Sequence, residues 1–161
     1  MGGHGALTLA LRHPGMFASV SAFAPVAAPM QCPWGVKAFT NDLGADRATW
    51  AAHDATELVR SRARAPALLV DQGLADKFLD EQLKIGAFEA AGQPLTLRRH
   101  SGYDHGYFFI ASFVEDHLRF HAQARPAGGF ARQARLRWRQ PTAAPAIRNP
   151  TVPRNSRTPR S

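Results

Sequence analysis

The chain has 161 residues, of which 45% are hydrophobic; this composition is typical of one globular domain, and no apolar run is long enough to span a membrane. Its formal net charge of +8 is unevenly distributed, because residues 1–124 contain 11 Lys and Arg against 12 Asp and Glu, whereas residues 125–161 contain nine Arg and no acid. The single cysteine, Cys32, excludes an internal disulfide and fits a reducing compartment such as the cytosol.

The first predicted element is a helix over residues 5–13, in which Leu7 and Leu11 fall on one face. A Pro-Gly pair directly after it ends the helix. Residues 17–23 are apolar and partly β-branched, and Pro25 follows them, so this short segment is predicted to be a buried strand.

Residues 25–65 are predicted to be mostly irregular, because prolines and glycines interrupt the segment repeatedly. Two short helices are expected within it, over residues 47–52 and 55–62. Asp46 and Asp54 stand where they would cap the N-termini of these two helices.

Three further elements are predicted in the next part of the chain. Residues 66–70 form a continuous apolar run of the kind that is buried in a parallel sheet. Residues 77–91 carry apolar side chains at helical spacing, and Gly92 follows them as a C-cap. Residues 94–99 alternate in the manner of a strand near the edge of a sheet.

The last predicted element is an amphipathic helix over residues 107–122. Four of its large apolar side chains are expected to reach the core: Phe109, Phe113, Leu118 and Phe120. The order of helices and strands along the chain is typical of an α/β fold with three parallel strands. We therefore expect residues 1–124 to form one α/β domain.

Residues 125–161 are rich in Pro, Arg, Ala, Gly and Thr, and Trp138 is nearly their only large apolar residue. Such a segment buries too little surface to offset an ordering entropy of about 1–2 kcal/mol per residue, so we expect a disordered basic tail. Its nine arginines leave open a nucleic-acid or acidic-surface partner, although an unstructured cationic segment binds anions weakly.

The segment DQGLAD, residues 71–76, follows the predicted strand at 66–70 and precedes a helix. Catalytic groups of open α/β sheets gather at the carboxyl ends of strands, and Asp76 there would suit the acid of a catalytic triad. The alternative is that Asp76 only caps the following helix. Asp71 is too close to the strand for this role, and Asp80 should already lie on the helix.

His105 lies in the loop GYDHGY, between the predicted strand at 94–99 and the last helix. A general base belongs on such a loop, and the flanking Gly102 and Gly106 allow sharp turns of the backbone. The alternative is a histidine that caps the helix or bonds to a backbone carbonyl. An acid after one strand and a histidine after the next is the order of a Ser…Asp…His hydrolase, so we expect His105 to hydrogen-bond to Asp76.

The opening residues MGGHG are similar to the small residues that follow the serine of a nucleophile elbow. In that motif the residue after the serine donates an N–H group to the oxyanion hole, and this role would fall on Met1. The alternative is a flexible glycine-rich segment.

Trp34, in the segment CPWG after the strand at 17–23, is expected to line a substrate pocket. The alternative is that Trp34 only packs an ordered loop. Cys32 has no Cys or His partner at metal-ligand spacing, so no metal site is predicted.

Four segments together resemble the S-formylglutathione hydrolase family of α/β-hydrolases, also called the esterase D family. They are MGGHGAL, CPWGVKAF, VDQGLADKFL and GYDHGYFFIASFVEDHLRFHA, and they are distributed over residues 1–122. The resemblance covers the C-terminal half of the family's fold and does not extend to the tail.

The resemblance implies a cytoplasmic serine thioesterase that hydrolyses S-formylglutathione to formate and glutathione in formaldehyde detoxification. It places the triad acid at Asp76, the triad histidine at His105 and an oxyanion-hole N–H group at Met1, with the serine one position before Met1. It also implies a small-molecule substrate and no cofactor, membrane or nucleic-acid partner, and it leaves a homodimer open.

Loss of a nucleophile costs about 10⁶ in rate, so the chain is expected to be inactive alone. It is also expected to be marginally stable, because the family's serine-bearing strand would pair beside residues 17–23. A general carboxylesterase of the same family is the alternative function. A nucleic-acid binder that acts through the basic tail is the alternative from a different class.

Overall fold

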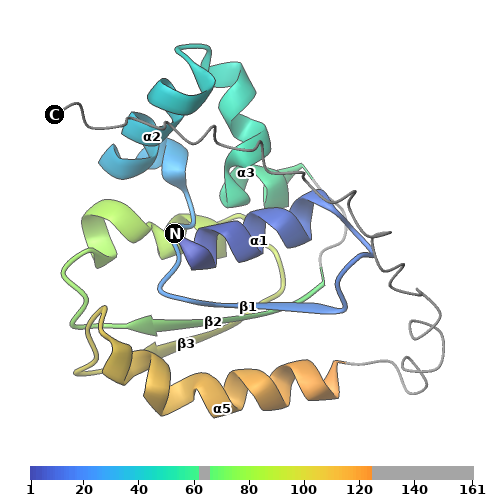
Figure 1. Cartoon of the computed structure of the whole chain (residues 1–161), viewed down its shortest axis with the longest axis vertical. Helices are drawn as coiled ribbons and strands as arrows, with labels where there is room; N and C mark the ends of the chain where they lie inside the picture. The colour runs from blue at the N-terminus through green and yellow to red at the C-terminus, as the bar shows by residue number, and fades with distance from the viewer. Residues whose placement is uncertain (62–65, 125–161) are drawn as a thin grey trace, which may run out of the picture. The chain divides into compact units, whose positions relative to one another are not determined.

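The computed structural model describes residues 1–61 and 66–124, which contain one sheet of three parallel strands (Figure 1). The strands are β1 (Ser19–Phe23), β2 (Ala67–Gly73) and β3 (Thr96–His100), in the order β1-β2-β3. The α/β class and the parallel sheet predicted from the sequence are therefore confirmed. The expectation of a basic tail concerns residues outside the described ranges.

Helices cover both faces of the sheet. On one face lie α1 (Gly2–Arg12), α3 (Ala55–Arg60) and α4 (Ile85–Ala90), and on the other lies α5 (Tyr107–Gln123) (Figure 1). None of the helices in the described ranges has the length and apolar character needed to cross a membrane.

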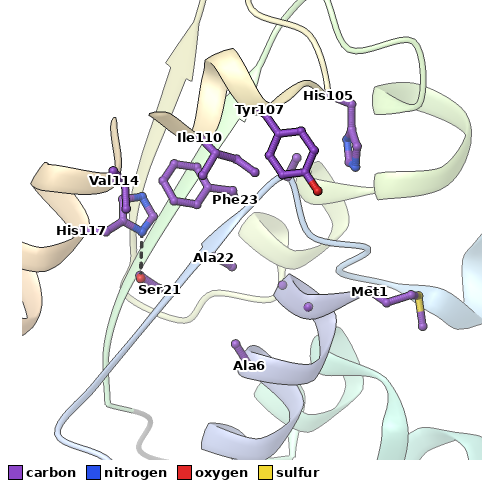
Figure 2. A pocket seen from close by; sticks show the side chains of 13 residues that line it. Met1, Ala6, Ser21, Ala22, Phe23, His105, Tyr107, Ile110, Val114 and His117 are labelled. Carbon is purple, nitrogen blue, oxygen red and sulfur yellow. Dashed lines mark hydrogen bonds between the residues drawn. The ribbon is translucent and has the colours of Figure 1, made fainter. Parts of the chain in front are cut away.

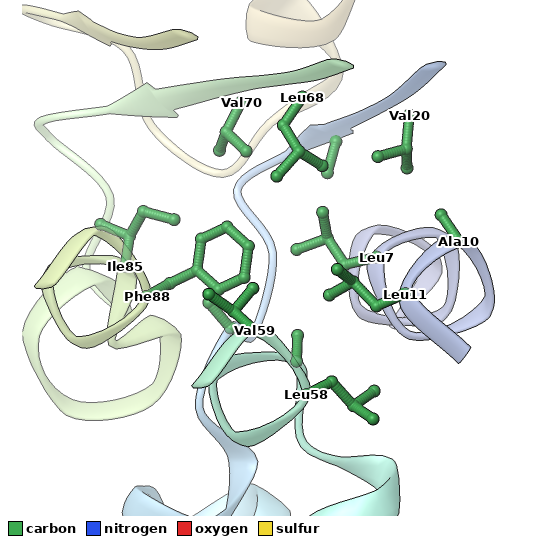
Figure 3. Packing of buried hydrophobic residues seen from close by; sticks show 13 residues of the cluster. Leu7, Ala10, Leu11, Val20, Leu58, Val59, Leu68, Val70, Ile85 and Phe88 are labelled. Atoms are coloured by element: carbon green, nitrogen blue, oxygen red, sulfur yellow. The ribbon is translucent and has the colours of Figure 1, made fainter. Parts of the chain in front are cut away.

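The main hydrophobic core lies between the sheet and helices α1, α3 and α4 (Figure 3). Because successive residues of a strand point to opposite faces, every second residue of β1 and β2 enters this core. Leu7 and Leu11, predicted to share one face of the first helix, are both buried in it. The other large members are Val20, Leu58, Val59, Leu68, Val70, Ile85 and Phe88.

The segment predicted to be irregular contains a regular helix, α2 (Pro33–Leu43), so that prediction is wrong. Proline fits the first turn of a helix, where its missing N–H group would have no partner. Cys32 caps the helix, because its Sγ accepts a hydrogen bond from Gly35 N at 3.4 Å. Gly35 is required by packing, since a Cβ there would come within 2.1 Å of the oxygen of Pro29. The residues that indicated a loop are those that begin this helix.

Both predicted aspartate caps are confirmed. Asp46 Oδ1 accepts a hydrogen bond from Ala48 N at 3.0 Å and begins a 3-10 segment, Arg47–His53. Asp54 Oδ1 accepts a hydrogen bond from Thr56 N at 2.8 Å and begins α3.

The continuous helix predicted over residues 77–91 is wrong, because the chain breaks at Lys84. This residue adopts a left-handed conformation, with φ 53° and ψ 34°, between a π-helical turn (Leu79–Leu83) and α4. The carbonyl of Leu83 accepts a hydrogen bond from Ala27 N at 2.8 Å instead of continuing the helix. Ile85 and Phe88, after the break, enter the main core, whereas Leu83, directly before it, enters a second hydrophobic cluster with Phe109.

Helix α5 forms as predicted, but its core face is partly different. Phe109 is 1% exposed, as expected, whereas Leu118 is 64% exposed and the neighbouring His117 is buried. Phe113 and Phe120 are half-buried. Apolar side chains also form a second, exposed row along the helix, which we call the α5 stripe: Tyr107, Ile110, Val114 and Leu118.

Candidate active site

Two loops beyond the carboxyl ends of neighbouring strands bring an acid and a histidine together. Asp76 follows β2 and His105 follows β3, and Nδ1 of His105 lies 2.7 Å from Oδ2 of Asp76. The hydrogen bond expected from the sequence is therefore present. Because a carboxylate only accepts hydrogen bonds, the proton of the imidazole sits on Nδ1. Within the described ranges Nε2 has no hydrogen-bond partner, so it is free to accept a proton.

Backbone contacts hold these two loops together. Leu74 N donates a hydrogen bond to His100 O, and Ala75 N donates one to Tyr103 O, both at 2.9 Å. Gly73 permits this close approach, since a Cβ there would lie 2.4 Å from Tyr103 O. Backbone geometry thus positions the acid and the histidine in addition to their own hydrogen bond.

The side chain of Asp76 is fully buried, and both of its oxygens accept hydrogen bonds. Oδ1 accepts one from Phe78 N at 2.9 Å, and Oδ2 accepts those of His105 Nδ1 and, at 3.5 Å, of Gln72 Nε2. A buried carboxylate that remains ionised needs such donors. Oδ1 thus bonds to the turn before the next helical segment (Leu79–Leu83), whose N-cap is Phe78 without a side-chain cap bond, so the alternative of a helix cap is not realised. Oδ2 is the partner of the histidine.

A cavity of about 710 Å³ lies beside β1 and reaches the N-terminal ends of α1 and α5 (Figure 2). His105 and Met1 both line it, together with apolar side chains of β1 and α5. The first turn of α1 has no acidic residue and no side-chain cap, so its free N–H groups carry a partial positive charge. Such a position suits an oxygen that becomes negative during acyl transfer.

Trp34 lies at the start of α2 with 44% of its surface exposed, and it is not part of the lining of this cavity. Its ring packs on Phe78, with 4.7 Å between the ring centroids, and Phe78 meets the ring of His105 edge-on at 5.5 Å. The structure therefore brings Trp34 toward the histidine only through an intervening aromatic ring.

A buried polar cluster between α5 and the sheet was not predicted from the sequence. Asp71 of β2 is fully buried, and Nε and Nη2 of Arg98 on β3 donate hydrogen bonds of 2.6 and 2.5 Å to its two oxygens. His117 Nε2 lies 3.2 Å from the same carboxylate, and Arg98 also bonds to Asp116 of α5 at 2.8 Å. Burial by itself would raise the pKa of Asp71, but the adjacent His117 and the hydrogen bonds and charge of Arg98 outweigh it and lower the pKa to about 2.

The same cluster extends to β1. His117 Nδ1 and His121 Nε2 each lie 2.8 Å from the hydroxyl of Ser21, and His121 Nδ1 lies 2.8 Å from that of Ser19 (Figure 2 shows the contact of His117). Burial, and then the neighbouring His117, lower the pKa of His121. We call this cluster the α5 anchor: Ser19, Ser21, Asp71, Arg98, Asp116, His117 and His121. The signal that could have revealed it is a carboxylate inside an apolar strand, with an arginine opposite it in register.

Within residues 1–61 and 66–124, no group of three or more His, Cys, Asp or Glu side chains is arranged to hold a metal ion. The acid, the histidine and the helix N-terminus together are the groups that acyl transfer requires around a nucleophile.

Comparisons of sequence and of structure with known proteins point to the same family. A family model described as a putative esterase matches residues 1–120. S-formylglutathione hydrolase of Arabidopsis thaliana is 52% identical over 129 residues, which cover 77% of this chain and 45% of that protein. The structure of an S-formylglutathione hydrolase from Agrobacterium tumefaciens is 50% identical, with a TM-score of 0.74, and the match covers 76% of this chain and 46% of that chain.

A more distant structure, S-formylglutathione hydrolase from Staphylococcus aureus, is 20% identical with a TM-score of 0.58 and shows the fold alone; the match covers 75% of this chain and 51% of that chain. The chain therefore spans about half the length of the relatives that it matches.

Proposed function

The chain belongs to the esterase family, and on this basis we propose that the protein it forms part of is a serine thioesterase that hydrolyses S-formylglutathione to formate and glutathione. The observation that supports the proposal most directly is the hydrogen bond of 2.7 Å between His105 and Asp76. Two relatives of about half-identical sequence carry the name of that activity, which supports the choice of substrate.

In the proposed mechanism, Nε2 of His105 takes the proton of a serine hydroxyl while the serine oxygen attacks the formyl carbon. Asp76 keeps the imidazole in the Nδ1–H tautomer and stabilises the imidazolium that forms. The backbone N–H group of Met1, at the start of α1, stabilises the oxyanion.

His105 then gives its proton to the sulfur of the departing glutathione, which leaves a formyl-serine ester. Water attacks this ester as His105 takes one of its protons, and the proton passes to the serine oxygen as formate is released. His105 therefore acts as base and then as acid in each of the two steps.

We place the nucleophile in the part of the relatives' length that this chain does not span, one position before Met1. Within the described ranges, no hydroxyl group bonds to His105. In the described sheet β1 pairs on one side only, and the cavity lies beside this strand with three residues of the α5 stripe in its lining. These apolar surfaces support a fold that further strands and helices complete.

The alternative substrate is a general carboxylic ester, for which the same Asp76–His105 pair would serve. We assign Trp34 as a substrate contact, because it extends the aromatic surface that begins at His105. Following the family, the proposal places the enzyme in the cytoplasm and in formaldehyde catabolism, without a cofactor, and it is compatible with a homodimer.

A chimera tests the proposal. Residues 1–124 would be joined to the preceding half of the Agrobacterium tumefaciens hydrolase, which is 50% identical over the shared part. We expect the chimera to hydrolyse S-formylglutathione with a higher kcat/KM than a p-nitrophenyl ester. His105→Ala should lower kcat by about 10⁴-fold or more, whereas His13→Ala, at an exposed position, should not change it.

The chain of 161 residues is assayed in parallel and should show no turnover. Circular dichroism establishes that each protein is folded. A folded chimera that fails to hydrolyse S-formylglutathione overturns the proposal. Equal activity on the thioester and on simple esters would instead favour the general carboxylesterase.

A further inference from the structure

We propose that Gln72 is a positioning residue whose buried side-chain amide holds the carboxylate of Asp76 in the rotamer that faces His105. This inference rests on the catalytic roles proposed above for Asp76 and His105.

Gln72 lies on β2, one residue before its end, and is completely buried. Its Nε2 donates to the carbonyl oxygen of Gly73 at 3.0 Å and to Oδ2 of Asp76 at 3.5 Å. The NH₂ group has two protons, so each acceptor receives one. The contact with Gly73 fixes the orientation of the amide and directs its second proton toward the acid.

Oε1 of Gln72 is buried and makes no hydrogen bond within the described part of the chain. An unpaired buried carbonyl is destabilising, and an apolar side chain of similar size would avoid the loss. A glutamine is therefore favoured here only if its N–H groups have a role that outweighs this loss, and the acceptor beside them is the carboxylate of Asp76.

The role follows from how the carboxylate is held. Oδ1 of Asp76 is bonded to the backbone N–H of Phe78, while Oδ2 is the acceptor for His105. Without a donor from Gln72, His105 alone would hold Oδ2 in place. Rotation of the carboxylate would then leave Nδ1–H without its acceptor and permit the Nε2–H tautomer, which cannot take a proton from a nucleophile.

The test compares two buried glutamines. Gln72→Met removes the amide with little change in volume, and Gln82→Met makes the same change at a residue that bonds to Trp34 N and not to Asp76 or His105. The readout in the 161-residue chain is the ¹⁵N spectrum of the His105 ring, which reports the tautomer without requiring activity. We expect Gln72→Met to increase the population of the Nε2–H tautomer, and we expect the spectrum of Gln82→Met to match that of the wild type.

In the active chimera, Gln72→Met should lower kcat by about tenfold, near the lower end of the effect of one hydrogen bond to a charged group, with KM changed less than about twofold. A wild-type tautomer in Gln72→Met overturns the inference, and so does an equal change of tautomer in Gln82→Met. An inactive chimera bears only on the proposed function, because the tautomer is measured separately.

A second measurement covers the case in which Gln72→Met does not fold. In the unaltered chain, one side-chain amide proton of Gln72 should be shifted downfield and protected from exchange with solvent. Asp76→Asn should reduce the downfield shift, since a neutral amide oxygen replaces the charged carboxylate as acceptor. Identical Gln72 amide signals in the two proteins would refute the inference.

Discussion

Replacing Asp71 with asparagine removes the buried carboxylate that neutralises Arg98 inside the α5 anchor. Asparagine keeps the shape of the side chain, but it leaves the guanidinium with Asp116 as its remaining acidic partner. Removing one member of a buried ion pair costs about 3–5 kcal/mol. Because Arg98 is 31% exposed and keeps that partner, we expect the lower end, a loss of about 3 kcal/mol in the free energy of unfolding at pH 7.

The pKa of Asp71 gives a second measure of how much its carboxylate stabilises the folded state. Its value of about 2, against 3.8 for an ordinary aspartate, corresponds to about 2 kcal/mol of stabilisation of the folded state. Because folding lowers this pKa, the stabilisation is present above about pH 4 and is lost as the pH falls toward 2. In Asp71→Asn the decline of stability over this interval should therefore be about 2 kcal/mol smaller than in the wild type.

Urea unfolding of the chimera, followed by tryptophan fluorescence at a series of pH values, measures both quantities. The matched control is Glu89→Gln, which removes a carboxylate from an exposed pair with Arg99 and should change stability by less than about 0.5 kcal/mol. Equal destabilisation by the two substitutions, or the same acid-side decline in wild type and Asp71→Asn, would refute the account of the α5 anchor.

Three further outcomes are expected. Asp76→Asn in the chimera should lower kcat by about 10⁴-fold without unfolding it, because asparagine favours the wrong imidazole tautomer; near-wild-type steady-state kinetics would exclude the triad role. Gly73→Ala should destabilise the chimera by about 1–3 kcal/mol in urea unfolding, since the new Cβ meets the backbone oxygen of Tyr103. Gly86→Ala, in open space on α4, should stabilise it by about 0.5–1 kcal/mol. Phe88→Ala should cost about 3–5 kcal/mol by the same measurement, and a loss below about 1 kcal/mol would contradict its central place in the core.

The sheet and the pair of site residues could be predicted because both follow from local patterns. Apolar runs between turn residues marked the strands, and the rule that catalytic groups follow strand ends selected Asp76 and His105. Their contact needed no long-range information beyond the adjacency of β2 and β3. Roles in catalysis remain proposals for both residues.

Other features depend on contacts between distant parts of the chain. The break at Lys84 arises because Leu83 bonds to Ala27, which lies far from it in sequence. Pro33 and Gly35 are typical of loops, but Pro33 fits the first turn of α2 and Gly35 lets a neighbouring backbone approach, so their presence does not indicate this helix. Neither the break at Lys84 nor helix α2 follows from a periodic pattern of apolar residues in the local sequence.

The α5 anchor also fixes the rotational setting of a helix. Apolar contacts are not directional, so an apolar helix face alone would tolerate small rotations of α5 about its axis. Hydrogen bonds and ion pairs are directional, and Asp116 and His117 meet Arg98 and Ser21 in one setting. Since α5 begins two residues after His105, a network more than ten residues away in sequence determines where the chain leaves the histidine loop.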